Sequence, residues 1–279
     1  MEGRLLSGIR EYEDVKIGEG ASGFLEGQRV FFKAFAADDD VSRMRFINEA
    51  NVLHTFRNHP NIAYLYGVST AAQERSSYYL ITKQYPYDIL DFFDSGADGE
   101  VSGEALKQIA LKICSTVQFL HEQGLVHGDI KSANVLLSHD LTPKLCDFES
   151  VSYGSPAPAA GPAVPLNEVE VRSTAYYLAP EVGFTHPVSY QSDIYSLGIL
   201  LNELASGDDP TSELGALMRG RPGASIQDLV RQGARPRIDS SVSEELKRII
   251  ELCWSPLPDD RPTASEVCYL LNAAAFPDF

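Results

Sequence analysis

Apolar residues in the first third of the chain alternate over short runs, and glycines separate these runs. The segment 13–35, EDVKIGEGASGFLEGQRVFFKAF, predicts strands interrupted at Gly18, Gly20, Gly23 and Gly27, because alternation is typical of half-buried strands and glycine of turns. Gly27 is predicted to close a tight hairpin. Residues 41–57 repeat apolar side chains at helical spacing instead, so this region is predicted to place strands around one helix.

Two charged residues fall on apolar faces of these elements. Glu49 shares a helix face with Phe46, Leu53 and Phe56, and a buried carboxylate is costly unless it is paired. Lys33, flanked by aromatic residues in RVFFKAF, is the candidate partner. The alternative is that either side chain extends to solvent.

After about residue 89 the pattern becomes mainly helical. Residues 105–124 place Leu106, Ile109, Ile113, Val117 and Leu120 on one face, before a glycine that favours a helix end. Residues 190–207 are apolar nearly all round, which predicts a buried central helix that contains Asp193. Thr263 and Glu266 form a capping box for a last helix reaching 275, and the Ala/Pro-rich segment 154–168 predicts a loop.

Composition limits the cellular setting and the partners. The chain has 279 residues and a net charge of −16, which opposes binding to nucleic acid or to an anionic membrane surface. The four cysteines show no metal-ligand spacing and are predicted to be buried thiols. With no signal peptide or membrane-spanning run, this pattern predicts an intracellular, cytoplasmic location and no membrane insertion.

Two short motifs suggest phosphate chemistry. GEGASG, residues 18–23, fits G-x-G-x-x-G, in which glycines allow backbone amides to approach a phosphate. Alone this match is weak, because no helix follows it as in a dinucleotide-binding fold, and an ordinary turn is the alternative. VHGDIKSANVLL, residues 126–137, sets an aspartate, a lysine and an asparagine at fixed offsets in an apolar stretch.

The order of these motifs resembles that of the eukaryotic protein kinases over nearly the whole chain. The glycine loop is followed by Lys33 and Glu49, then by the catalytic-loop pattern 127–134, Asp147-Phe148 and Ala179-Pro180-Glu181. Asp193-x-x-Ser196-x-Gly198 and CWSPLPDDRPT, 253–263, complete the series. Lys131 and Thr174 make the resemblance strongest to serine/threonine kinases of the tyrosine-kinase-like group.

The resemblance implies an α+β fold with a small, mainly β N-lobe carrying one helix and a larger, mainly α C-lobe. The implied boundaries are an N-lobe at 1–82, a hinge at 83–88 and a C-lobe at 89–279, forming one kinase domain over about 12–275. It also implies a packed stack of Leu53, Leu65, His127 and Phe148, anchored on Asp193.

The same resemblance implies transfer of the γ-phosphoryl group of Mg-ATP to a serine or threonine hydroxyl of a protein substrate. Asp129 would accept the hydroxyl proton and Lys131 would steady the γ-phosphate, while Asn134 and Asp147 would bind Mg²⁺. The implied nucleotide-binding residues are Gly18, Gly20, Gly23, Leu25, Lys33, Glu49, Thr82, Tyr85 and Leu136. The oligomeric state stays open.

Three positions depart from the family pattern. Gly128 replaces an arginine that usually pairs with an activation-loop phosphate, so we expect no switching by that route. Glu149 replaces a glycine, and Phe31 stands where the family has alanine against adenine. These departures keep a second hypothesis open, a pseudokinase that acts as an interaction module. A small-molecule kinase is disfavoured, because such enzymes lack the Ala-Pro-Glu element.

Overall fold

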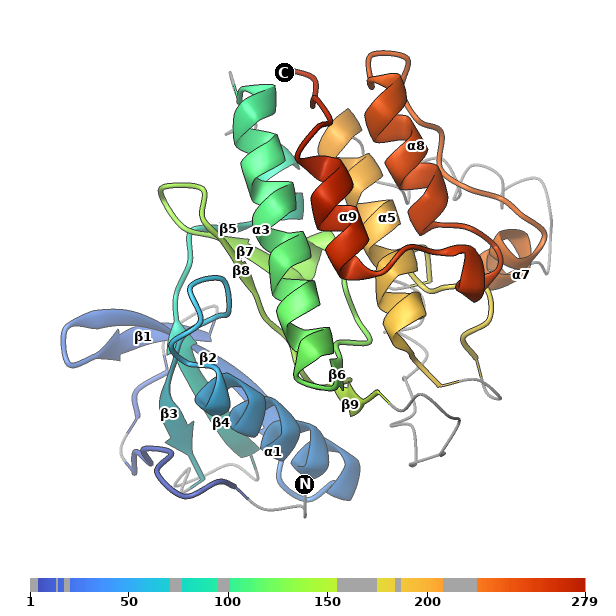
Figure 1. Cartoon of the computed structure of the whole chain (residues 1–279). Coiled ribbons are helices and arrows are strands. Elements are labelled where there is room, and N and C mark those ends of the chain that lie inside the picture. The colour runs from blue at the N-terminus through green and yellow to red at the C-terminus, as the bar shows by residue number, and fades with distance from the viewer. Residues whose placement is uncertain are drawn as a thin grey trace.

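The computed structural model describes residues 5–13, 15–17, 21–70, 77–94, 101–154, 175–183, 187–207 and 225–278. The chain forms a smaller lobe from its N-terminal part and a larger helical lobe from the remainder (Figure 1). The smaller lobe holds an antiparallel sheet in the order β1-β2-β4-β3. Its elements are β1 (Ser22–Leu25), β2 (Gln28–Ala36), α1 (Asp40–Thr55), β3 (Leu65–Ser69) and β4 (Ser77–Lys83).

The hairpin predicted at Gly27 is confirmed. Leu25 pairs with Gln28 across a two-residue turn, and both turn residues have positive φ, 51° at Glu26 and 81° at Gly27. A turn with two positive φ angles matches the right-handed twist of the flanking strands.

Helix α1 was predicted over 41–57 and runs over 40–55. It starts at the N-cap Asp39, whose carboxylate accepts hydrogen bonds from the amides of Val41 and Ser42. Phe46 packs against Phe35 of β2, with ring centroids 5.6 Å apart. This contact fixes α1 against one face of the sheet.

The larger lobe confirms the predicted α+β class. Its helices are α2 (Ile89–Asp94), α3 (Gly103–Glu122), α5 (Tyr190–Ser206), α7 (Ile226–Arg231), α8 (Glu244–Cys253) and α9 (Ala264–Leu271), with 3₁₀ turns η2 (Ser132–Asn134) and η3 (Pro258–Asp260). Short strands β5 (Tyr87–Asp88), β7 (Val135–Leu137) and β8 (Pro143–Leu145) form a second sheet, and β6 (Leu125–Val126) pairs with β9 (Ser152–Tyr153).

The two long helices follow their apolar patterns. All five predicted apolar residues of α3 are buried, and Gly124 follows the helix with φ +76°. Helix α5 is buried along nearly its whole length and ends at Gly207 with φ +68°. A left-handed residue after the last turn is the common helix terminator, and glycine adopts it at no steric cost.

One apolar core runs through both lobes. It includes Phe46 and Leu53 of α1 together with Leu106 of α3 and Leu200 of α5. Backbone bonds also join the lobes, since the amide of Ala63 donates to Leu145 over 2.9 Å. The lobes are therefore one packed unit.

Three predictions need correction or fall outside the described residues. The last helix ends at Leu271 rather than 275, because the chain beyond it turns to pack on α3, where the Gly103 amide donates to the Asp278 carboxylate at 2.6 Å. Cys146 and Cys268 are partly exposed, so burial of all four thiols was wrong. Residues 155–168 of the predicted loop lie outside the described residues.

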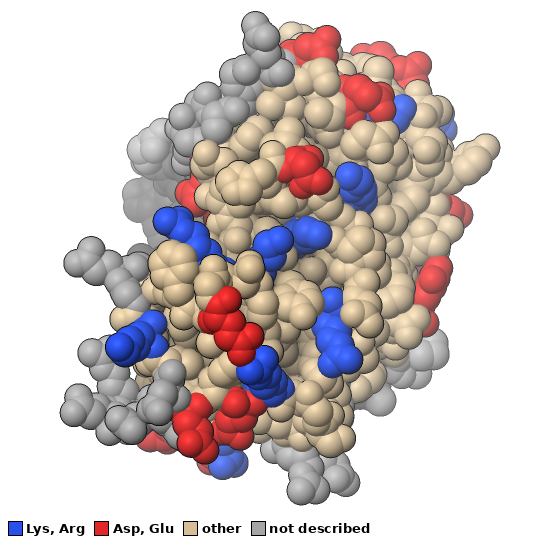
Figure 2. All heavy atoms as spheres, turned by 90° about the vertical axis from the view of Figure 1, so that its left-hand side faces the viewer, with Lys and Arg blue, Asp and Glu red and all other residues tan. Residues whose placement is uncertain are grey.

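The surface in Figure 2 carries both basic and acidic side chains among larger uncharged areas, although the chain as a whole is acidic. Among the described helices, none is long and apolar enough to cross a bilayer.

Candidate active site

Lys33 and Glu49 form the ion pair predicted from their places on apolar faces. Lys33 Nζ, on β2, lies 2.7 Å from Glu49 Oε2, on α1. The Glu49 side chain is only 4% exposed, so its carboxylate needs this partner. The pair joins the sheet to the helix.

Lys33 also contacts two further carboxylates. Its Nζ lies 2.9 Å from Asp147 Oδ1 and 2.7 Å from Glu149 Oε1. Glu149 Oε2 in turn lies 3.6 Å from the Arg45 guanidinium on α1. Three carboxylates therefore surround the Lys33 ammonium, and Arg45 contacts one of them.

This clustering shifts the pKa values of its members. Burial opposes the charge on Lys33, but Glu49, Asp147 and Glu149 outweigh burial and raise its pKa well above the usual value. Burial raises the pKa of Glu49 to about 7, and the neighbouring carboxylates add to this shift against the opposing effect of Lys33. Burial opposes the charge on Asp147, but the charge and hydrogen bond of Lys33, together with His127 and Lys131, outweigh burial and lower the Asp147 pKa. Lys33 is a firmly charged ammonium in this setting.

A second polar cluster lies in the segment 129–134. Asp129 Oδ2 accepts hydrogen bonds from Lys131 Nζ at 2.7 Å and from Asn134 Nδ2 at 2.8 Å. Asn134 Nδ2 also reaches the Asp129 carbonyl at 2.8 Å. Within the described part of the chain, Asp129 Oδ1 is buried and has no hydrogen-bond partner. A buried carboxylate oxygen without a partner is unusual, and this one can still accept a hydrogen bond.

The central helix α5 holds this cluster in position. Asp193, which is 1% exposed, accepts hydrogen bonds from the backbone amides of His127 at 2.8 Å and Gly128 at 2.9 Å. The His127 ring packs on Phe148 with centroids 4.9 Å apart, and Leu53 and Leu65 are buried in the same core as Phe148. The His127–Phe148 contact and its anchoring on Asp193 are thus confirmed, and Leu53 and Leu65 share the core that contains Phe148.

Gly128 has a backbone reason to be glycine. Its φ is +81°, in the left-handed region, where a residue with a Cβ is strained. A Cβ there would also lie 3.0 Å from the Ser150 carbonyl and 3.2 Å from Val188. Gly128 therefore suits the loop that presents Asp129.

The two polar clusters adjoin because β7 and β8 are paired. Val135 faces Leu145 in this ladder, and the Cys146 amide donates to the Asn134 carbonyl at 3.0 Å. Asp147 follows directly with φ +62°. The antiparallel pairing therefore sets Asp147 beside Asn134.

The predicted nucleotide-binding residues of the small lobe lie on neighbouring strands. Phe31 of β2 pairs with Thr82 of β4, and the ladder runs without interruption from Val30 to Ala36. Phe31 and Lys33 therefore share a face of β2, and Phe31 is 40% exposed. The Phe31 ring therefore lies on the same side of the small-lobe sheet as the Lys33 ammonium.

The remaining predicted residues lie on β1, before β5 and on β7, or outside the described residues. Gly23 and Leu25 are on β1, and a Cβ on Gly23 would lie 2.7 Å from the Phe32 ring. The Tyr85 hydroxyl accepts a hydrogen bond from the Tyr64 amide at 3.3 Å, and Leu136 is half-buried on β7. Gly18 and Gly20 lie outside the described residues.

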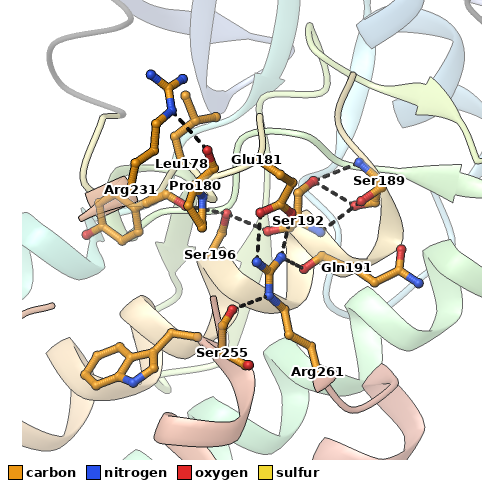
Figure 3. A network of polar contacts seen from close by, with 12 residues as sticks. Leu178, Pro180, Glu181, Ser189, Gln191, Ser192, Ser196, Arg231, Ser255 and Arg261 are labelled. Atoms are coloured by element: carbon orange, nitrogen blue, oxygen red, sulfur yellow. Dashed lines mark hydrogen bonds and ion pairs between the residues drawn. The ribbon is translucent and has the colours of Figure 1, made fainter. Parts of the chain in front are cut away.

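A buried ion pair holds the Ala-Pro-Glu segment (Figure 3). The Arg261 guanidinium donates to both carboxylate oxygens of Glu181, at 2.6 and 2.8 Å. It also donates to the carbonyls of Gln191 and Ser255, each at 2.9 Å. The Arg261 side chain is 0% exposed, so the pair is a bidentate buried contact of the strong kind.

Sequence reasoning missed several of these partners. It did not predict the Glu149–Lys33 contact, the Glu149–Arg45 contact or the Glu181–Arg261 pair. It also missed Glu203 of α5, which is buried and accepts a hydrogen bond from the Tyr177 hydroxyl. Glu203, like Glu49, is a carboxylate on an apolar helix face, and this position predicts a buried partner for it.

Comparison with known proteins identifies the family. The family model described as "Protein kinase domain" matches residues 13–270, which is most of the chain. Together with the two-lobed fold and the converging polar clusters, this shows that the chain belongs to the protein kinase domain family.

Individual relatives are distant. A probable serine/threonine-protein kinase of Dictyostelium discoideum is 27% identical over 92% of this chain and 27% of its own length. Serine/threonine-protein kinase PAK 5 of Rattus norvegicus is 27% identical over 92% of this chain and 35% of its own. Tyrosine-protein kinase STYK1 of Mus musculus is 29% identical over 82% of this chain and 53% of its own. The chain thus spans between about a quarter and a half of these relatives' lengths.

Proposed function

We propose that this domain is an ATP-dependent protein kinase that transfers the γ-phosphoryl group of Mg-ATP to a serine or threonine hydroxyl of a protein. The observation that carries the proposal is the state of Asp129. One of its oxygens is held by Lys131 and Asn134, and the other is buried without a partner among the described residues. The hydroxyl group of a substrate would donate a hydrogen bond to this second oxygen.

Each residue of the catalytic loop then has a task. Asp129 orients the incoming hydroxyl and accepts its proton, since a general base must lie within hydrogen-bond reach of the proton that it takes. Lys131, whose Nζ lies 2.7 Å from Asp129 Oδ2, would steady the γ-phosphate. Asp193 keeps the loop rigid, so that little reorganisation is needed during the reaction.

The donor set beside this loop fits magnesium. Asn134 and Asp147 offer amide and carboxylate oxygens, which Mg²⁺ prefers, and the β7–β8 pairing sets the two residues side by side. When bound, the ion would neutralise charge on the β- and γ-phosphates. We propose Asn134 and Asp147 as its protein ligands.

The small lobe and the connection to the large lobe would hold the nucleotide. We propose Lys33, braced by Glu49, as the phosphate ligand, and Gly18, Gly20, Gly23 and Leu25 as the cover over the phosphates. Thr82, Tyr85 and Leu136 would border adenine. The division into 1–82, a hinge at 83–88 and 89–279, within one domain of about 12–275, belongs to this proposal.

Substrate class and location are proposed on chemical and compositional grounds. The names of two cited relatives specify serine/threonine kinases and one a tyrosine kinase, and Lys131 after the catalytic aspartate favours serine or threonine. Acidic net charge disfavours nucleic acid as a partner. A chain with four free cysteines favours an intracellular location.

A second candidate function is an interaction module with weak or no phosphoryl transfer. Two observations favour it. Phe31 projects from the face that carries Lys33, next to Thr82, where it would crowd a purine ring. Glu149 engages Lys33 at 2.7 Å in place of a ligand.

Phosphate incorporation tests the first function directly. The wild-type domain should transfer labelled phosphate from Mg-ATP to a mixed protein substrate or to itself. Asp129→Asn should lower this rate by about 10²- to 10⁴-fold, the range for loss of a general base, with nucleotide binding retained. If wild-type protein gives no transfer and millimolar Mg-ATP leaves its unfolding midpoint unmoved, the interaction module is favoured, because a ligand specific for the native state raises stability.

A further inference from the structure

Glu149 lies where a nucleotide phosphate would have to reach Lys33. We propose that Glu149 is an internal competitor for the nucleotide phosphates: its carboxylate occupies Lys33 in the free protein, and a bound nucleotide must displace it. The inference rests on the role proposed above for Lys33 and names the residue that sets the affinity of this site for anions.

The contacts show that Glu149 is not needed to neutralise Lys33. Glu49 already lies 2.7 Å from the ammonium, and Asp147 lies 2.9 Å away. Glu149 adds a third carboxylate at 2.7 Å. A glycine, which the family pattern has at this position, would leave that side of Lys33 open.

Glu149 is held from two elements, and this makes it an effective competitor. One oxygen contacts Lys33 of β2, and the other lies 3.6 Å from Arg45 of α1. The side chain is only 18% exposed, so its contacts are weakly screened by salt. A carboxylate fixed beside its partner has a high effective concentration compared with a free ligand.

Charge balance gives the direction of the effect. Lys33 and Arg45 contact three carboxylates, those of Glu49, Asp147 and Glu149, and Lys131 adds a positive charge that acts on Asp147 from the catalytic loop. Phosphate and carboxylate oxygens compete for the same charged donors. An incoming phosphate is therefore opposed both by the occupied ammonium and by like charge, and both effects decrease when Glu149 is neutralised.

Inorganic tripolyphosphate is the sharpest probe, because it has the phosphates of ATP without the purine that Phe31 would crowd. We would titrate it calorimetrically into wild-type, Glu149→Gln and Glu149→Gly proteins at low ionic strength without divalent cations. Glu149→Gln keeps the side-chain shape, and Glu149→Gly restores the family residue. Both variants should bind at least about ten-fold more tightly than wild type, which corresponds to a change of about 1.4 kcal/mol.

Two controls separate local competition from net charge. Asp38→Asn removes one negative charge at an exposed position preceding α1, and its affinity should stay within about two-fold of wild type. Adding Lys33→Met to Glu149→Gln should abolish the gain. Equal affinity in wild type and both Glu149 variants would overturn the inference, as would a gain that survives loss of Lys33.

A parallel titration with Mg-ATP distinguishes this inference from the proposed function. If the Glu149 variants gain tripolyphosphate binding but no protein binds ATP, Glu149 competes as inferred and the kinase proposal fails. If wild-type protein binds ATP and the Glu149 variants bind both probes no better, the kinase proposal stands and the inference is wrong.

Discussion

The two sides of the candidate active site are built from different kinds of contact. On the C-lobe side, backbone amides bound to Asp193 hold a loop in which Asp129 keeps one buried oxygen without a partner among the described residues. On the N-lobe side, Lys33 contacts three carboxylates at once. The C-lobe side can accept a hydrogen bond from a ligand as it stands, whereas Lys33 on the N-lobe side must lose a carboxylate contact before it can bind one.

This difference shows that a chain can retain the residues of a motif while their side chains are not free to contact a ligand. Lys33, Glu49, Asp129, Asn134 and Asp147 are all present and converge. The residue that limits access, Glu149, lies at a position where the family pattern has no side chain at all. Access of a phosphate to this domain should therefore be limited by the N-lobe side rather than by the catalytic loop.

The largest expected effect comes from breaking the buried ion pair of the C-lobe. Arg261→Ala removes one partner of a buried bidentate pair and leaves Glu181 without its counter-ion. Such a loss costs about 3–5 kcal/mol of unfolding free energy, measured by urea denaturation.

Arg10→Ala is the matched control, because its pair with Glu26 is 60% and 63% exposed. Exposed pairs contribute little, so this variant should unfold at nearly the wild-type urea midpoint. Equal losses in the two variants would show that the buried pair does not support the lobe as described.

An intermediate effect is expected from the loop that presents Asp129. Gly128→Ala places a Cβ at φ +81° and 3.0 Å from a carbonyl oxygen, so it should destabilise the protein by about 2 kcal/mol, the upper part of the left-handed range. Gly124→Ala has φ +76° with nothing within 4 Å and should cost only about 1 kcal/mol. Thermal unfolding of both variants measures backbone strain alone at Gly124 and strain plus a close contact at Gly128. Identical shifts of the unfolding midpoint would exclude a contribution from the Ser150 contact.

The smallest expected effect is on the purine side of the N-lobe. Phe31→Ala removes an aromatic ring that is 40% exposed and lies across from Thr82. If the ring crowds adenine, ATP should bind several-fold more tightly while tripolyphosphate binding stays unchanged. Weaker ATP binding in a fluorescence titration would instead show that the ring stacks on the purine.

Much of the fold could be predicted from local sequence patterns, because each turn, helix end and buried face is determined by a few neighbouring residues. Gly27, Gly124 and Gly207 mark a turn and two helix ends through their backbone freedom. The Lys33–Glu49 pair was predictable because each charge lies on an apolar face and must find a partner. Burial of Asp193 followed from the all-round apolar helix that contains it.

The rest depended on contacts between distant segments. Glu149 follows Asp147-Phe148 with no pattern that points to Lys33, and only the packing of β2, α1 and the turn after β8 brings them together. Arg261 reaches Glu181 across 80 residues. The last helix was predicted too long because alanine favours helix anywhere, whereas tertiary packing on α3 turns the chain away after Leu271.

The apolar core that runs through both lobes has a consequence for dissection of the molecule. Phe46 and Leu53 bury their side chains in the same cluster as Leu106 and Leu200. Cutting the chain near residue 88 would therefore expose a large apolar surface to solvent on each fragment. Separately expressed fragments should aggregate, and the native fold should be recovered only when the two fragments are refolded together.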